Sequence, residues 1–361
     1  MLLGQMFNVK FRIMLILVIS VLVSGCSKQE DITSVNASMV PYKICSINNK
    51  KLAPLEQEIC MSGAYIQEDI PYTEIKAFEQ KINAINNIYI NRINKDDDFP
   101  VDFVVDCIAK DKIPLLRVSS EISYNDVMTI ALTCGNLNLP MFIELDYNDE
   151  IEKYNSHSEL FRGYAPKVAL VYGFNIDKES YELPNNELYD WVSINASENM
   201  TNGTIDSNFL DISRWCNIYK DKSIMISIAI PIFSTNKCNY AIDEACKELE
   251  NIYNLSEMFN NIGSINYYSY VLTEDDIRTF SSRLSESEKL LQKYGEVINN
   301  LPKKRYYNDT PYVGYVINDK IYVTRNVANN LGLKGVFGGY SDLMEVSEAS
   351  FDKDLRKIFV K

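Results

Sequence analysis

Short apolar runs alternate with amphipathic stretches over residues 61–271. Apolar residues spaced three and four apart predict helices in several of the amphipathic stretches, at residues 72–85, 101–109, 124–134 and 243–254. The runs are strand-sized and rich in β-branched or aromatic residues, as buried strands are; they cover residues 63–67, 87–90, 114–118, 140–145, 168–173, 190–195, 224–230 and 264–271. This rhythm predicts an α/β fold in the form of an eightfold β/α (TIM) barrel. A doubly wound open sheet has the same local pattern and is the alternative.

The pattern changes after residue 300. Residues 274–299 read as a helix, and residues 303–307 as a basic, aromatic linker. Two alternating runs then flank Asn318, Asp319 and Lys320, a sequence that favours a hairpin turn. A short helix that ends at Gly332 follows, so the C-terminal part predicts a separate small α+β domain.

The N-terminus has the pattern of an export signal. Lys10 and Arg12 precede an unbroken apolar run at residues 13–23, which is too short to span a bilayer stably. Small residues then lead to Cys26, and the pattern resembles the lipobox of bacterial lipoproteins. It implies a chain outside the cytoplasm, anchored to the membrane through a lipid on Cys26; an uncleaved anchor helix, or a secretory signal with an unrelated cysteine, is the alternative. The predicted organisation is a signal at residues 1–26, a tether at 27–58, the barrel at 59–302 and the small domain at 303–361.

Charge and cysteine usage narrow the function classes. The formal net charge of −13 and the isoelectric point near 4.8 argue against nucleic acid as a partner, because phosphate binding needs a basic surface. Seven cysteines remain beyond Cys26, with no CxxC pair among them. Cys238 and Cys246 would close the shortest disulfide loop, but burial as inert thiols is the expectation for most of the seven.

Three segments carry a resemblance to a family. In chain order, residues 167–175 (KVALVYGFN), 183–195 (LPNNELYDWVSIN) and 221–230 (DKSIMISIAI) resemble the fifth, sixth and seventh strands of glycoside hydrolase family 26. The likeness extends more weakly over residues 61–300, and known members of the family include β-mannanases. The resemblance implies a glycosidase-like barrel.

Two departures bear on activity. Where the family places its nucleophilic glutamate, after IMIS, this chain has Ile228, and where it has its acid/base glutamate, this chain reads Asp146 followed by Tyr147. Retaining hydrolysis needs two carboxyl groups about 5–5.5 Å apart. The departures therefore predict a barrel that binds polysaccharide or cell-envelope glycan without cutting it. An active hydrolase with relocated carboxylates (Glu144, Asp146 or Glu274) and a protein-binding envelope scaffold are the alternatives.

Working groups of a β/α barrel lie at the C-terminal ends of its strands. Aromatic rings pack on sugar C–H faces, and amides, carboxylates and guanidinium groups bind hydroxyls. Arg117 and Glu144 would alternatively form only an ion pair at the rim, and Trp191 is expected in the barrel core because it lies deeper in its strand than Asn195. The candidate residues are Gln67, Glu68, Arg117, Glu144, Asp146, Tyr172, Asn175, Asn195, Tyr267 and Tyr268.

No cofactor or metal is expected. His157, the only histidine, falls in a polar stretch and is expected in an exposed loop, and the acidic runs at residues 96–98 and 146–150 lack the spacing of a calcium loop. Residues 314–332 (GYVINDKIYVTRNVANNLG) resemble a motif of the small domains named after the N-terminal region of copper amine oxidases, with Thr324 at the motif's proline. The stretch contains no His or Cys, so no copper is inferred.

Overall fold

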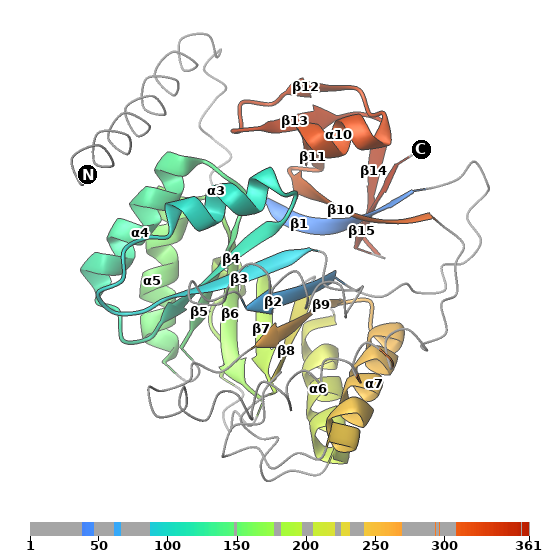
Figure 1. Cartoon of the computed structure of the whole chain (residues 1–361). Helices are drawn as coiled ribbons and strands as arrows, with labels where there is room; N and C mark the ends of the chain where they lie inside the picture. The colour runs from blue at the N-terminus through green and yellow to red at the C-terminus, as the bar shows by residue number, and fades with distance from the viewer. Residues whose placement is uncertain are drawn as a thin grey trace, which may run out of the picture. The chain divides into compact units, whose positions relative to one another are not determined.

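The computed structural model describes residues 38–46, 61–65, 87–147, 150–176, 182–196, 205–220, 225–231, 242–268, 293, 296, 308–354 and 356–360. Eight parallel strands form a closed barrel in chain order, because β2 pairs with both β3 and β9 (Figure 1). The strands are β2 (Met61–Tyr65), β3 (Ile88–Ile93), β4 (Ile113–Ser119), β5 (Phe142–Asp146), β6 (Ala169–Asn175), β7 (Trp191–Asn195), β8 (Met225–Pro231) and β9 (Ile262–Tyr268). An open sheet would leave β2 and β9 as edges, which the pairing excludes.

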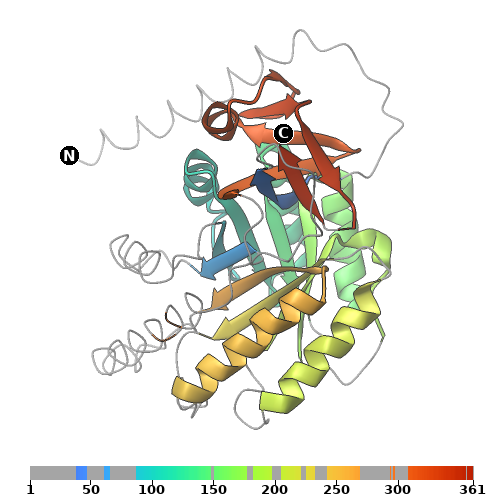
Figure 2. The ribbon, with the colours of Figure 1, turned by 90° about the vertical axis from the view of Figure 1, so that its right-hand side faces the viewer.

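Helices follow several of these strands and confirm the mixed α/β class. Ser123 accepts a hydrogen bond from the backbone N–H of Asp126 at the start of α4, and Asn138 ends that helix with a positive φ of 50°. Figure 2 shows α6 and α7 side by side along the barrel. The helices are α3 (Val101–Ala109), α4 (Tyr124–Leu137), α5 (Ile151–Tyr164), α6 (Ile205–Lys220) and α7 (Ile242–Met258), and a 3-10 turn, η2 (Asn186–Leu188), precedes β7.

Side-chain alternation along the strands divides the core into two clusters. The outer cluster packs between strands and helices and includes Leu116, Ile143 and Val192. The inner cluster lies within the barrel and consists of Met61, Ile88, Ile90, Ile113, Leu115, Phe142, Ala169, Val171, Trp191 and Val313. The Phe142 and Trp191 rings meet edge to face, with centroids 5.0 Å apart, so the expectation of Trp191 in the barrel core is confirmed.

A second, seven-stranded sheet holds the C-terminal part of the chain. The predicted hairpin is confirmed: β10 and β11 pair antiparallel, and Asn318 and Asp319 both have positive φ, as a tight hairpin turn requires. Thr324 caps α10, and Gly332 ends it with a φ of 67°. The elements are β10 (Asn308–Ile317), β11 (Lys320–Thr324), α10 (Arg325–Leu331), β12 (Gly335–Phe337), β13 (Leu343–Val346), β14 (Ala349–Asp352) and β15 (Lys357–Val360).

One strand of this sheet comes from the predicted tether. β1 (Val40–Ser46) pairs antiparallel with β10 and parallel with β15, in the sheet order β12-β13-β11-β10-β1-β15-β14. Ile44 is fully buried among Val323, Ile358 and their neighbours. The tether over residues 27–58 was therefore wrong for residues 40–46, where one short apolar stretch pairs with strands far along the chain.

The same sheet covers one end of the barrel. Val313 of β10 belongs to the inner cluster, and Val40 and Tyr42 of β1 pack against it. A backbone hydrogen bond of 2.8 Å from the Met39 N–H to the Lys167 carbonyl, just before β6, places this contact at the N-terminal end of the strands. The C-terminal end, opposite, is where the polar residues described below lie.

Several predicted features lie outside the described residues. These are the signal with Cys26, the helices at residues 72–85 and 274–299 apart from Lys293 and Glu296, and the Cys238–Cys246 loop up to residue 241. Within the described part of the chain, no helix is both long and apolar enough to cross a bilayer.

The role of β1 yields a stability prediction. Ile44→Ala should lower the free energy of unfolding by about 2–5 kcal/mol, because it leaves a cavity in a fully buried position, whereas Ile44→Val should cost only about 0.5–1.5 kcal/mol. Urea unfolding of both variants measures the difference. An Ile44→Ala variant as stable as the parent chain would show that this segment does not belong to the sheet.

Candidate functional site

Polar residues gather on the inner face at the C-terminal end of the barrel. Strands in register present the same face, so Arg92, Arg117 and Glu144 share it through one run of pairings, and Asn175 and Asn195 share it through another. Asn266 of β9 belongs to the second run, because it is in register with Ala229, which is in register with Asn195. We call these residues the barrel-end set: Arg92, Arg117, Glu144, Asp146, Asn175, Asn195 and Asn266.

Arg117 bridges the two carboxylates of this set. Its Nε lies 3.2 Å from Oε1 of Glu144, and its terminal nitrogen NH2 lies 2.6 Å from Oδ2 of Asp146. Glu144 is 1% exposed and Asp146 is 25% exposed, so the bridge runs from the buried interior toward solvent. Gly173 makes room for it, because a Cβ there would lie 3.0 Å from Glu144 Oε1. The expectation that Arg117 and Glu144 pair is confirmed.

Amides occupy the opposite arc of the ring. Asn195 donates a hydrogen bond of 3.3 Å from Nδ2 to Oδ1 of Asn175. Asn266 is fully buried and requires Gly63 on β2, since a Cβ at residue 63 would lie 2.6 Å from its Oδ1. Amides and ion-paired carboxylates side by side present both donors and acceptors, the chemistry that binds sugar hydroxyls.

The position of Ile228 corrects one expectation. Ile228 is in register with Ile194, is fully buried and belongs to the outer cluster, so it does not occupy an inward position at the barrel end. The β8 residues in register with Ser193 and Asn195 are Ser227 and Ala229, and neither carries a carboxyl group. β8 therefore places no carboxyl group in register with Ser193 or Asn195.

Tyr172 is a second correction. Its side chain is fully buried in the outer cluster, where its ring meets Tyr154 at a centroid distance of 4.8 Å. Alternation explains this, because Val171 and Gly173 on either side belong to the inner face. The structure brings Arg117, Glu144, Asp146, Asn175 and Asn195 together and leaves Tyr172 out. Among the other candidates, Gln67, Glu68 and Cys26 lie outside the described residues, as do the side chains of Tyr267 and Tyr268.

Arg92 belongs to the barrel-end set but was not among the sequence candidates. The apolar run predicted a strand at residues 87–90, whereas β3 extends to Ile93. A strand two residues longer would have put Arg92 at the C-terminal end of β3, in register with Arg117. The polar residues Asn91 and Arg92 ended the apolar run, so the last residues of the strand were not recognised.

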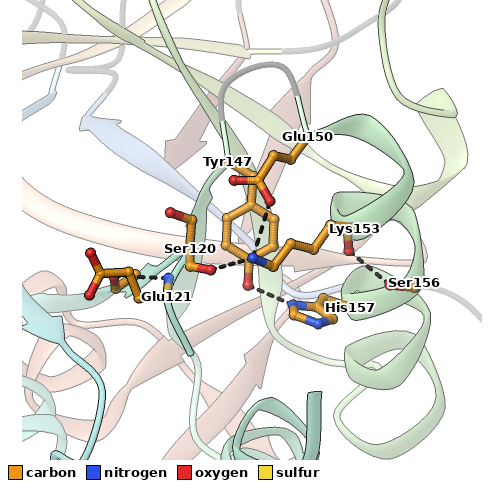
Figure 3. A network of polar contacts seen from close by, with 8 residues as sticks. Ser120, Glu121, Tyr147, Glu150, Lys153, Ser156 and His157 are labelled. Carbon is orange, nitrogen blue, oxygen red and sulfur yellow. Dashed lines mark hydrogen bonds and ion pairs between the residues drawn. The ribbon is translucent and has the colours of Figure 1, made fainter. Parts of the chain in front are cut away.

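His157 is a third correction, because it is a buried helical residue rather than an exposed loop residue. It lies in α5, is 3% exposed, and its Nδ1 lies 2.6 Å from the Tyr147 hydroxyl (Figure 3). Lys153 lies beside this pair, where it donates to the Ser120 carbonyl and forms a 3.1 Å ion pair with Glu150. Burial lowers the pKa of His157, and the like charge of Lys153 lowers it further.

The described residues hold no cluster of three or more His, Cys, Asp or Glu side chains suited to a metal ion. The cysteines whose side chains are described, Cys45, Cys107, Cys134 and Cys216, are buried thiols, as expected. Burial raises the pKa of the Cys216 thiol to about 12, which keeps it protonated and unreactive at neutral pH.

No protein-family model matches the chain, and no curated protein matches it. Among solved structures, a β-glucuronidase of Ruminococcus gnavus is 8% identical with a TM-score of 0.41, over 59% of this chain and 44% of the enzyme. A Bacillus subtilis mannanase is 10% identical with a TM-score of 0.36, over 63% and 80%. A Bacteroides thetaiotaomicron protein assigned as an α-L-fucosidase is 11% identical with a TM-score of 0.44, over 76% and 99%.

All three neighbours are named as glycoside hydrolases. The chain spans less than half the length of the glucuronidase.

The ion-pair bridge predicts a strong response to loss of Arg117. Arg117→Met should lower the free energy of unfolding at pH 7 by about 3–5 kcal/mol, because it leaves the buried Glu144 carboxylate without its counter-charge. Adding Glu144→Gln should recover part of that loss. Lys110→Met is the matched control, since it removes an exposed ion pair with Asp106 and should cost less than about 1 kcal/mol. Equal losses for the two single variants in urea unfolding would contradict the bridge.

His157 predicts a pH-dependent stability. Its folded-state pKa lies below the ordinary value of 6.5, so the unfolded chain takes up a proton first as the pH falls. The contribution of neutral His157 is complete above pH 6.5 and is lost as the pH falls through its folded-state pKa. Because the chain has one histidine, His157→Gln should flatten the decline in unfolding free energy just below pH 6.5. An unchanged decline would assign the effect to other groups.

Proposed function

We propose that this chain is a carbohydrate-binding protein whose glycosidase-like barrel binds polysaccharide or cell-envelope glycan without hydrolysing it. One observation carries the proposal: both carboxylates of the barrel-end set, Glu144 and Asp146, lie on the same strand and are bound by the same guanidinium. Hydrolysis of a glycosidic bond needs two carboxyl groups flanking that bond. Two acids on one strand, both occupied by Arg117, do not flank a substrate.

The strand that would supply the second acid also supports this proposal. Ser227 and Ala229 hold the β8 positions in register with Ser193 and Asn195, and an alanine or a serine does not replace a carboxylate nucleophile at an anomeric carbon. Three further members of the set, Asn175, Asn195 and Asn266, are amides, which suit hydroxyl recognition. We further propose that the protein acts outside the cytoplasm, anchored through a lipid on Cys26, as its N-terminal sequence indicates.

An active glycoside hydrolase with relocated carboxylates is the second candidate. It is favoured by the presence of two acids, Glu144 and Asp146, at the end of the barrel where catalytic groups of such folds lie. In this reading a substrate would have to displace Arg117 from one of the two carboxylates before either acts as an acid or a nucleophile. The hydrolase would cleave glycans, whereas the binding protein would not.

The full chain should bind glycans on an array and release no reducing ends from mannan, glucan or cell-wall glycan. Asn195→Ala should weaken binding about 3- to 10-fold, the effect of losing one neutral hydrogen bond. Asn330→Ala, an exposed asparagine on α10, is the matched control and should leave affinity unchanged. Turnover that Glu144→Gln abolishes would establish the hydrolase, and absence of binding to every glycan would refute the proposal.

A further inference from the structure

Arg92 is placed beside Arg117 on the inner face of the barrel. Two and four residues before it, Ile90 and Ile88 belong to the inner cluster, while Ile93 belongs to the outer one. Alternation therefore gives Arg92 the inner face, and its pairing with Arg117 puts the two residues on neighbouring strands in the same layer. The ring thus has two guanidinium groups and two carboxylates at one end.

Only one of the two guanidinium groups forms ion pairs with the two carboxylates. Arg117 forms ion pairs with both Glu144 and Asp146. The Nε of Arg92 is buried and has no hydrogen-bond partner, and no ion pair within the described part of the chain involves its guanidinium. A partly buried guanidinium without a counter-charge is costly, because its charge is removed from water without compensation. Such a group in a folded protein calls for an explanation, and a partner from outside the chain supplies one.

We propose that Arg92 binds a carboxylate on the ligand, and that the glycan this barrel prefers is therefore acidic, built from uronic acid units. The inference rests on the proposed carbohydrate-binding function and narrows its ligand class. A guanidinium is a planar fork that matches a carboxylate with two parallel hydrogen bonds. The amides of Asn175 and Asn195, on the same face, serve the hydroxyl groups of the same sugar.

Because the protein as a whole is acidic, a preference for an acidic glycan would indicate a local cationic group in the binding site. At a net charge of −13 the protein does not attract anions in general, so selectivity for an acidic glycan has to come from a local cationic group. At 0.15 M ionic strength, interactions beyond about 8 Å are largely screened, and contact with Arg92 is what remains. Measurements at this ionic strength therefore report the site rather than the whole surface.

The test uses the full chain in detergent and calorimetric titration with three probes: tetragalacturonic acid, its methyl ester and mannotetraose. The acid should bind at least about tenfold tighter than its ester, the effect expected of a charge-assisted contact. Arg92→Gln should abolish that difference by lowering the affinity for the acid at least about tenfold. Arg325→Gln removes the same charge from an exposed position on α10 and should preserve the preference.

Thermal unfolding without ligand gives a second readout. Because no ion pair of the described residues holds the Arg92 guanidinium, Arg92→Gln should leave the midpoint unchanged or raise it, whereas a structural role would lower it. Equal affinity of the parent chain for acid and ester overturns the inference and leaves the proposed function standing. Retention of the preference by Arg92→Gln overturns the assignment to Arg92. Binding of none of the probes, or of any glycan on an array, removes the proposed function as well.

Discussion

Alternation of side chains along a closed ring of parallel strands is the constraint on which the rest of this structure depends. Once β2 pairs with β9, each residue of every barrel strand has either the interior or the helices as its neighbour. Apolar residues can fill both the barrel interior and the face that packs on the helices. A charged residue on the inner face is tolerated only at the open end of the barrel, where it reaches solvent or a counter-charge. The polar layer of Arg117, Glu144 and their neighbours therefore forms at one level, at the ends of the strands.

This constraint also decides how the charges in that layer behave. Glu144 is almost fully enclosed, and a carboxylate in such a place persists only with a counter-charge and hydrogen-bond donors. Arg117 supplies both and in doing so takes up Asp146 as well. Both carboxylates are thus engaged by one guanidinium, and in the proposed function Arg92 is the cation that contacts the ligand.

Much of the fold follows from the sequence, and the misses have identifiable physical causes. Short runs of β-branched and aromatic residues located the barrel strands, and Asn318 with Asp319 located the hairpin, because both signals are local. β1 was missed because its partners lie at the far end of the chain. His157 was missed because a polar stretch can form an amphipathic helix with few apolar residues, and its burial depends on Tyr147 packing across.

The site followed from the sequence only in part. Arg117, Glu144 and Asn195 were found because they end recognisable strands. Tyr172 was misassigned and Arg92 overlooked for one reason: the face and the final residues of a strand depend on its register, which the pairing partners set. Counting alternation from the buried residues Val171 and Ile90 would have sorted both correctly once those were known to face inward.

The central position of β1 has a consequence for how the protein is made. β1 precedes the whole barrel in the chain, while both strands that flank it, β10 and β15, follow the barrel. The barrel is thus an insertion within the small domain, and the sheet cannot be completed until β15 has been synthesised. A long loop must close before β1 gains any pairing, which slows that step. Pairing of β1 therefore follows synthesis of the whole barrel sequence.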